Sequence, residues 1–220
     1  MTILLALAAF YAAMMLLRYG RRGVLVLAPS LVRSRSTSGG PLPTEAQAAA
    51  ATELEALGFR RIGSRVEEGP LRGLGLRSES FVDPARSAFA DVFEHGPRSG
   101  APARLQMLSV FPDGAAVLTA NHGRAPQSGR WGEVTGLRAA ALGQVAEVHR
   151  RTVLRLESAH GASLPATDLA GRDAAARNWY RRAGGWEIRR RFAIYLGNSV
   201  FAAAILAFSI AALVRTRAAP

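Results

Sequence analysis

Four histidines, His95, His122, His149 and His160, are the side chains best suited to metal binding or to acid–base chemistry near neutral pH. No pair of them has the spacing of a short metal-binding motif on a helix. Glu147 and His149 are two residues apart, so on a helix their side chains point to different faces. A metal site would have to assemble from distant loops. We therefore expect histidines in loops or at the surface, with no metal and no bound cofactor.

Other common catalytic groups are missing or lack their usual neighbours. The chain contains no Cys and no Lys, which excludes thiolate catalysis, disulfides, Schiff-base lysines and a phosphate-binding loop of the Walker A type. Ser64 and Ser163 lie near glycines, but neither has the flanking residues of a hydrolase nucleophile. Gly73 and Gly75 form only half of a dinucleotide-binding loop, and a turn or the start of a strand is the simpler interpretation.

A polar cluster, Asn121, His122 and Arg124, follows a predicted β-hairpin and is the best candidate for a ligand site. These residues would meet at one end of the sheet, where loops commonly bind ligands. His95 comes from another loop and completes the predicted ligand-binding set. The alternative, which we favour, is that Asn121 and Gly123 simply form a turn.

Two apolar segments flank the part of the chain that carries these groups. Residues 192–214 form a run of 23 residues without a charge, and about 20 apolar residues are enough to cross a bilayer as a helix. Residues 2–17 form a shorter apolar run, and the long side chain of Arg18 can reach the membrane surface from its end. We predict two transmembrane helices. A cleaved signal peptide is the alternative for the first, but its positive cluster follows the apolar core instead of preceding it.

The positive charge belongs to these flanks. The chain has a net charge of +12, yet residues 44–176 carry 15 Arg and 15 acidic residues and are neutral. A nucleic-acid-binding domain should carry a basic face of its own. We therefore predict the lipid bilayer as a partner and no nucleic acid.

Arg is distributed unevenly across the two apolar segments. Five Arg lie between residues 18 and 35 and none precedes the first segment, while six lie between residues 177 and 191 and two follow the second. The positive-inside rule then places the middle of the chain in the cytoplasm and both termini outside. Because Arg without Lys is typical of GC-rich bacterial genomes, we expect a bacterial inner membrane. Trp179 and Tyr180 are also interpreted as interface side chains. The main predicted membrane-interface residues are Arg18, Arg21, Arg22, Trp186, Arg189, Arg190 and Arg191.

Local patterns divide the region between the spans into helices and strands. Thr44 and Gln47 predict a helix start, and Gly58 predicts the end of that helix after Leu57. Asp113 and Gly114, between two apolar runs, predict a hairpin whose strands lie in the centre of the sheet. Further helices are expected at 133–159 and 167–180. The predicted strands are 59–67, 73–82, 86–94, 104–111 and 115–120.

The expected fold is α+β, with an antiparallel sheet of four or five strands and helices on one face. The predicted organisation comprises an N-terminal transmembrane anchor with its basic flank (1–22), an interfacial segment and flexible linker (23–43), a cytoplasmic α+β domain (44–180), a basic juxtamembrane segment (181–191), a C-terminal transmembrane helix (192–214) and a short tail (215–220).

Two functional hypotheses follow. The first is a non-enzymatic, two-span membrane protein whose cytoplasmic domain binds a small ligand, a protein partner or a second copy of the chain. The second is a membrane-anchored enzyme with a distributed His/Asn/Arg site, in which His95 or Glu94 joins Asn121, His122 and Arg124.

Overall fold

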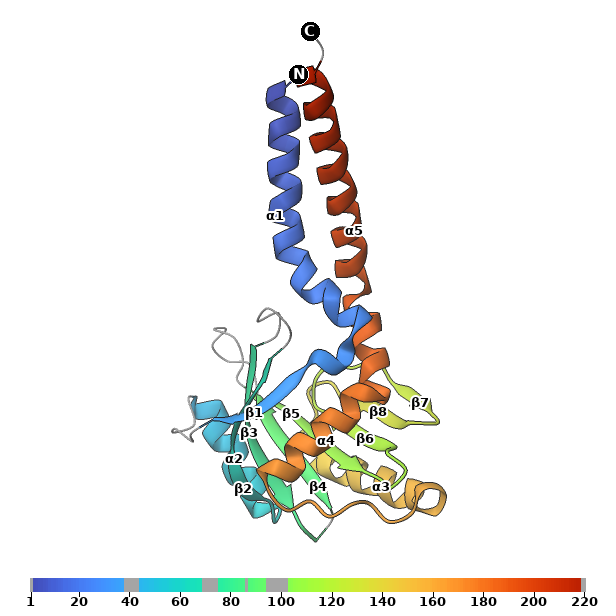
Figure 1. Cartoon of the computed structure of the whole chain (residues 1–220). Coiled ribbons are helices and arrows are strands. Elements are labelled where there is room, and N and C mark those ends of the chain that lie inside the picture. The colour runs from blue at the N-terminus through green and yellow to red at the C-terminus, as the bar shows by residue number, and fades with distance from the viewer. Residues whose placement is uncertain (1, 38–43, 69–74, 86, 94–102, 219–220) are drawn as a thin grey trace. The chain divides into compact units, whose positions relative to one another are not determined.

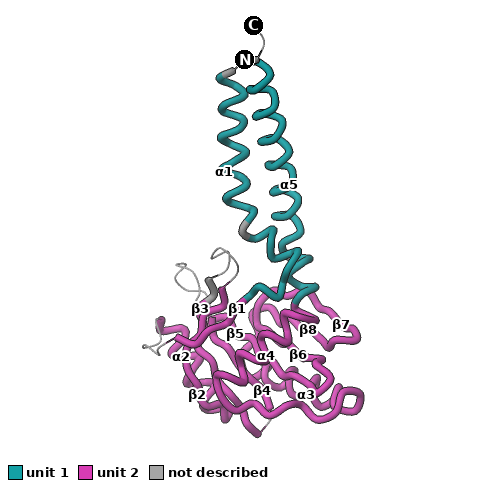
Figure 2. Tube along the Cα trace, viewed as in Figure 1, with its two compact units in different colours: residues 1–32, 69–74, 185–220 teal, residues 33–68, 75–184 magenta. Residues whose placement is uncertain are grey.

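The computed structural model describes residues 2–37, 44–68, 75–85, 87–93 and 103–218 (Figure 1). The chain divides into two compact units (Figure 2). The helical unit comprises residues 1–32, 69–74 and 185–220, and the sheet unit comprises residues 33–68 and 75–184.

The helical unit contains two helices that are long and apolar enough to cross a membrane. They are α1 (Thr2–Leu27) and most of α5 (Ala183–Ala218), with the short 3-10 helix η1 (Pro29–Leu31) after α1. Their apolar windows are Ile3–Gly20 and Phe192–Thr216, of which 6% and 17% are buried. A core helix of a globular domain would be mostly buried, so the apolar side chains of these windows need another apolar environment.

The two helices of this unit pack closely around one glycine. A Cβ atom added at Gly23 would lie 3.2 Å from the Cα atom of Leu196 and 3.1 Å from the Ser199 hydroxyl oxygen. α1 therefore approaches α5 at a residue that has no side chain. Near the same place the rings of Tyr19 and Tyr195 lie with their centroids 5.8 Å apart. α1 and α5 therefore contact each other near Gly23.

The sheet unit is built on one mixed sheet of eight strands in the described residues, in the order β1-β2-β3-β4-β5-β6-β8-β7. β6 and β8 pair in parallel, and the other neighbours pair antiparallel. The prediction of four or five antiparallel strands is therefore wrong in number and orientation. The strands are β1 (Arg33–Thr37), β2 (Arg60–Glu68), β3 (Gly75–Asp83), β4 (Ala88–Phe93), β5 (Arg104–Val110), β6 (Ala116–Ala120), β7 (Gln127–Gly129) and β8 (Gly132–Gly136).

The five predicted strands correspond to β2 to β6, and the three missed strands have sequences without a strand pattern. β1, with the sequence RSRST, lies at an edge of the sheet and comes from the predicted linker. β7 and β8 are short and rich in glycine, and β8 overlaps the start of the helix predicted at 133–159. Because no apolar alternation marks these segments, only their pairing reveals them as strands: β1 pairs with β2, β8 with β6, and β7 with β8.

One glycine allows the parallel pairing. Gly132 has φ +111°, and a Cβ atom there would lie 1.8 Å from the carbonyl oxygen of Ala116. Only a residue without a side chain permits this approach of β8 to β6.

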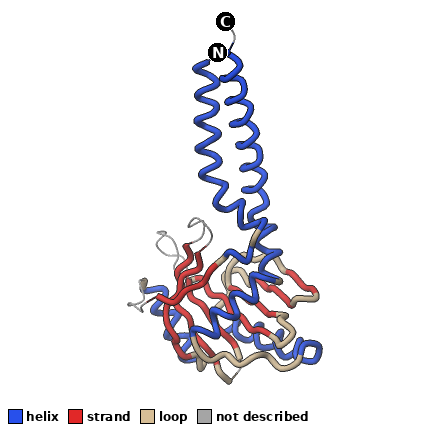
Figure 3. The backbone as a smooth tube through the Cα atoms, viewed as in Figure 1, coloured by secondary structure: helices blue, strands red, loops and turns tan. Residues whose placement is uncertain are grey.

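Helices cover both faces of the sheet, so the prediction of helices on one face is wrong (Figure 3). α2 (Glu45–Ala56) and α3 (Leu142–His160) contribute to one hydrophobic core cluster. This cluster contains Val145 of α3 and the strand residues Phe81 and Met107. α4 (Leu169–Arg181) covers the opposite face and buries Trp179 against Val82, Leu108 and Leu118. The central strands are apolar on both faces, and each face therefore needs its own cover.

The local signals at helix ends are largely confirmed. The Thr44 side chain accepts a hydrogen bond from the Gln47 amide at 3.2 Å and begins α2. Gly58, with φ +94°, ends this helix, and the Phe59 amide donates to the Leu54 carbonyl at 3.0 Å. α3 starts at Leu142 rather than at 133, because the preceding residues pair in β8.

Candidate functional site

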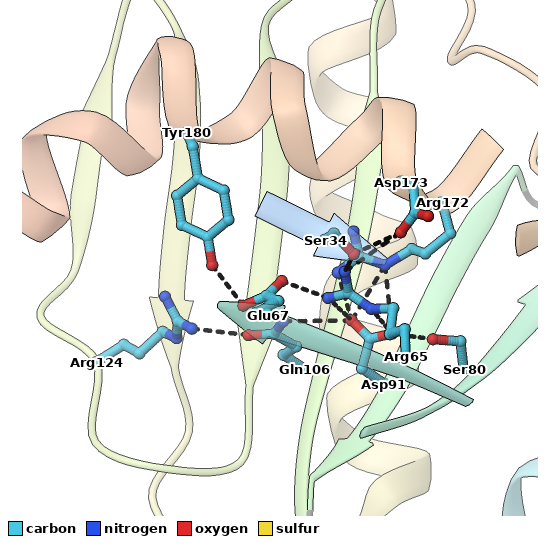
Figure 4. A network of polar contacts seen from close by, with 10 residues as sticks. All are labelled: Ser34, Arg65, Glu67, Ser80, Asp91, Gln106, Arg124, Arg172, Asp173 and Tyr180. Atoms are coloured by element: carbon cyan, nitrogen blue, oxygen red, sulfur yellow. Dashed lines mark hydrogen bonds and ion pairs between the residues drawn. The ribbon is translucent and has the colours of Figure 1, made fainter. Parts of the chain in front are cut away.

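A network of charged side chains lies between α4 and the sheet (Figure 4). Its members come from β1 to β5, from α4 and from the loop after β6, and we call them the buried ionic network. They are Ser34, Arg65, Glu67, Ser80, Asp91, Gln106, Arg124, Arg172, Asp173 and Tyr180.

Asp91 on β4 is the centre of this network. Its carboxylate accepts hydrogen bonds from Arg172 Nε at 3.1 Å, from Arg65 Nε at 3.2 Å and from the Ser80 hydroxyl at 2.7 Å. Asp91 and Arg172 are each 1% exposed, and Arg65 is fully buried. Two guanidinium groups thus balance the charge of Asp91 and that of Glu67.

Glu67 and Asp173 complete the network at its two ends. Glu67 forms an ion pair with Arg65 and accepts a hydrogen bond from the Tyr180 hydroxyl at 2.5 Å. At the other end, Ser34 donates to Asp173 at 2.5 Å and accepts from Arg65 Nη1 at 2.7 Å. Both ends therefore tie α4 to strands at one side of the sheet.

Strand register explains why these residues meet. Ser80 on β3 pairs with Asp91 on β4, and Asp91 pairs with Gln106 on β5, so the three side chains share one face. Arg65 and Glu67 are two residues apart on β2 and face the same side. None of these residues was among the sites predicted from the sequence. The alternation of Arg65 and Glu67 was the only local signal.

The pKa values in the network move away from neutrality. Burial alone would raise the pKa of Asp91, but Arg172 and Arg65 outweigh it and hold that pKa well below its ordinary value. The same balance of burial against Arg65 and Arg172 lowers the pKa of Glu67. Burial and the neighbouring Glu67 raise the pKa of Tyr180. A general acid or base works best with a pKa near the working pH, so these three groups are suited to holding structure and not to proton transfer.

His149 on α3 is the buried histidine of the opposite face, contrary to the expected loop or surface position. The Ser109 hydroxyl donates its single proton to the Ser87 carbonyl oxygen at 2.9 Å, so it accepts from His149 Nε2 at 3.0 Å. Nδ1 then accepts from the Thr119 hydroxyl at 3.1 Å. Burial lowers the pKa of His149 to about 3. The ring is therefore neutral, and Ser109 and His149 do not form a nucleophile–base pair.

A cavity of about 470 Å³ opens beside α3, next to this histidine. Small-molecule sites in proteins usually have volumes of about 300–1,000 Å³ and combine apolar walls with a few polar groups. The cavity has this character. Its lining includes the apolar side chains of Phe59, Met107 and Ala146 and the polar side chains of Asp83, His149 and Glu157.

The predicted ligand-binding residues are placed differently. Asn121 is 8% exposed, and its side chain accepts from the Leu105 amide at 2.8 Å and donates to the Ala103 carbonyl at 2.9 Å. Arg124 donates to Gln106 at 2.7 Å and so extends the buried ionic network. Asn121 also lines a second cavity of about 410 Å³, beside α2.

The remaining candidates are His122, His95 and Glu94. His122 is partly exposed in the loop after β6. His95 and Glu94 lie outside the described residues. The ligand-binding role of Asn121, His122, Arg124 and His95 therefore stays a prediction. The side chain of Asn121 links the end of β6 to the start of β5 by hydrogen bonds. In the described part of the chain, no group of three or more His, Asp or Glu is placed to hold a metal ion.

The predicted membrane-interface residues of the helical unit gather around tyrosine and tryptophan rings. Arg22 Nη1 donates to the Tyr195 hydroxyl at 3.0 Å, and Arg18 lies 5.7 Å from the centre of the Tyr19 ring. Arg21 belongs to α1 and Arg191 to α5.

The basic run before the second span makes similar contacts. Arg190 lies 5.5 Å from the centre of the Trp186 ring, and Trp186 is 47% exposed. Arg189 Nε donates to the Val26 carbonyl oxygen at 3.3 Å. By contrast, Trp179 is 3% exposed in the core and Tyr180 bonds to Glu67, so their interpretation as interface side chains is wrong.

Comparisons with protein-family models, with curated proteins and with solved structures find no match to this chain.

Proposed function

We propose that this chain is a non-enzymatic, two-span protein of the bacterial inner membrane that presents a small-ligand-binding α+β domain in the cytoplasm. The cavity of about 470 Å³ beside α3 is the observation that carries the binding function. Its volume suits a small molecule, and its lining combines apolar side chains with Asp83, His149 and Glu157.

Binding fits this cavity better than catalysis does. The neutral His149 has both ring nitrogens engaged by hydroxyl groups. Glu157 accepts hydrogen bonds from the Ser163 amide at 3.3 Å and from the Ser163 hydroxyl at 3.2 Å. The Glu157 carboxylate is thus already oriented, and a group of this kind fixes the position of a ligand at little cost in conformational entropy.

The membrane part of the proposal rests on the helical unit. α1 and α5 contact each other near Gly23 and expose large apolar side chains along their spans, for example Phe10 at 68% and Phe208 at 71%. Exposure of this kind is costly in water and favourable in lipid. The excess of Arg beside the two spans supports a cytoplasmic sheet unit. A protein partner or a second copy of the chain stays a prediction.

A cavity-filling variant tests the binding function. We expect at least one compound from a library of bacterial metabolites to raise the thermal unfolding midpoint of the purified full-length chain in detergent, by several degrees at saturating concentration. Ala146→Phe should abolish this response, because Ala146 lines the cavity beside α3. Ala140→Phe is the matched control, since Ala140 lines only the second cavity.

Two outcomes would contradict the proposal. One is a library in which no compound stabilises the wild-type chain. The other is an Ala146→Phe variant that is more stable than the wild type and responds to the same compounds, which would identify the cavity as an unused void.

A further inference from the structure

The turn between β7 and β8 presents an exposed tryptophan between two arginines. The guanidinium carbon of Arg182 lies 4.3 Å from the centre of the Trp131 ring, and that of Arg130 lies 4.9 Å from it. Trp131 is 38% exposed, although large aromatic side chains are usually more deeply buried. We call these three residues the Trp131 cluster.

The backbone holds the tryptophan of this cluster in place. The Trp131 carbonyl oxygen accepts a hydrogen bond from the Ala116 amide at 3.1 Å. The next residue is Gly132, whose close approach to Ala116 permits no side chain. The turn is thus fixed to β6, and Trp131 is presented from a defined position.

Arg182 is also held in place. Its Nη1 donates to the Asp113 carbonyl oxygen, and its guanidinium group lies over Gly114, where a Cβ atom would come within 2.4 Å of it. A side chain ordered before binding loses little conformational entropy when it meets a ligand. Arg130 is exposed beside it.

Two acidic residues lie near the cluster, and one of them interacts with Arg182 as well as with other partners, because the charge of Arg182 helps to lower the pKa of the Asp113 carboxyl. The Asp113 carboxylate lies 2.7 Å from His160 Nδ1 and accepts from the Ala115 amide at 2.9 Å. Glu133, on the strand after the turn, pairs with Arg155 at 2.5 Å. The cluster therefore presents two guanidinium groups, one of them beside the Asp113 carboxylate, and one indole ring.

The chain tethers this cluster near the second apolar window. Phe192 follows Arg182 by ten positions, which is about 15 Å of helix or at most about 35 Å of extended chain. Trp186 and Arg190 lie between them. Trp and Arg side chains are common where a protein contacts lipid headgroups.

We propose that Arg130, Trp131 and Arg182 bind the phosphate of anionic lipid headgroups, so that the sheet unit docks on the cytoplasmic leaflet. The inference rests on the membrane anchoring in the proposed function. Both guanidinium groups supply paired donors for phosphate oxygens, and the indole ring supplies an amphipathic surface for the headgroup region.

Hydrogen exchange of the full-length chain in lipid nanodiscs tests this docking. In discs that contain phosphatidylglycerol, we expect the amides of residues 127–136 to exchange roughly tenfold more slowly than in discs of phosphatidylcholine alone, because two arginines near an anionic surface each add attraction. Raising the salt concentration to 1 M should remove most of the difference. Arg130→Gln and Arg182→Gln should each reduce it, while Arg104→Gln, at an exposed arginine elsewhere, should not.

Different outcomes would refute the lipid docking and the membrane anchoring on which it rests. Equal exchange of residues 127–136 in the two kinds of disc would overturn the docking. The same would follow if inorganic phosphate alone produced the protection in discs of phosphatidylcholine, since the cluster would then be a site for free anions. Fast exchange of the α1 and α5 amides in every disc would instead refute the membrane anchoring. Arg130→Gln changes an exposed side chain and keeps the test valid if Arg182→Gln does not fold.

Discussion

Asp91 and Arg172 are 81 residues apart in the chain and form an ion pair in which each side chain is 99% hidden from solvent. The pair joins β4 to α4, the helix that covers this face of the sheet. A buried ion pair is often no more stable than apolar packing, but removing one partner leaves the other charge buried and costs about 3–5 kcal/mol.

We expect Arg172→Met to destabilise the sheet unit by about 3 kcal/mol, at the lower end of this range because Arg65 still faces Asp91. The thermal unfolding midpoint of the full-length chain in detergent should fall by roughly 6–12 °C. Arg177→Met, at an exposed position of α4, is the control and should change it little. The double variant Arg172→Met with Asp91→Leu should recover part of the loss. If Arg172→Met and the control Arg177→Met had equal unfolding midpoints, the packing of α4 would not depend on the ion pair.

His149 should make the domain sensitive to mild acid. Its pKa is about 3 when folded and about 6.5 when unfolded, so the unfolded chain binds a proton first as the pH falls. The stability contributed by the neutral ring is complete above pH 6.5 and declines between pH 6.5 and 3. From pH 7 to pH 5 the loss is about 2 kcal/mol.

Unfolding by urea at a series of pH values measures this loss. His149→Asn should lower stability at pH 7 and flatten the dependence between pH 7 and pH 5. The lowered pKa values of Asp91 and Glu67 act at more acidic pH, where protonation of those carboxylates costs stability. An unchanged slope in the variant would show that His149 is not the source of the sensitivity.

Gly132→Ala should separate β8 from β6. The added Cβ atom would lie 1.8 Å from the Ala116 carbonyl oxygen, and the residue has φ +111°, so both space and backbone conformation oppose it. We expect a loss of at least about 3 kcal/mol in unfolding free energy. Gly129→Ala lies in the same hairpin with open space around its Cβ position and should cost far less. Comparable midpoints for the two variants in thermal unfolding would contradict the parallel pairing.

The proposed orientation can be tested with single cysteines, because the chain has none of its own. In intact cells, a membrane-impermeant maleimide should label Thr216→Cys, near the end of α5, and should not label Ser158→Cys, which is exposed on α3. After the cells are opened, Ser158→Cys should react as well. Labelling of Ser158→Cys in intact cells would reverse the orientation.

The amino-acid sequence by itself determined the features that depend on neighbouring residues. The apolar windows of α1 and α5 follow from composition, since about 20 apolar residues suffice for a span. The start of α2 at Thr44 and its end at Gly58 follow from local hydrogen bonding. The hairpin at Asp113 and Gly114 was also predicted correctly, because the turn residues lie between the strands they join.

The tertiary structure decided the features that depend on distant partners. β1 and β8 have no strand pattern of their own and become strands only by pairing with β2 and β6. Both faces of the sheet are covered because α4 returns to the side opposite α2 and α3.

The same reason explains the missed polar sites. A charged residue such as Asp91 reads as a surface residue until Arg65 and Arg172, which lie far from it along the chain, are brought beside it. The contacts of His149 with Ser109 and Thr119 also join separate elements. Burial and pairing are properties of the packed sheet. The local sequence pattern does not identify the distant side chain that supplies the opposite charge or the hydrogen bond.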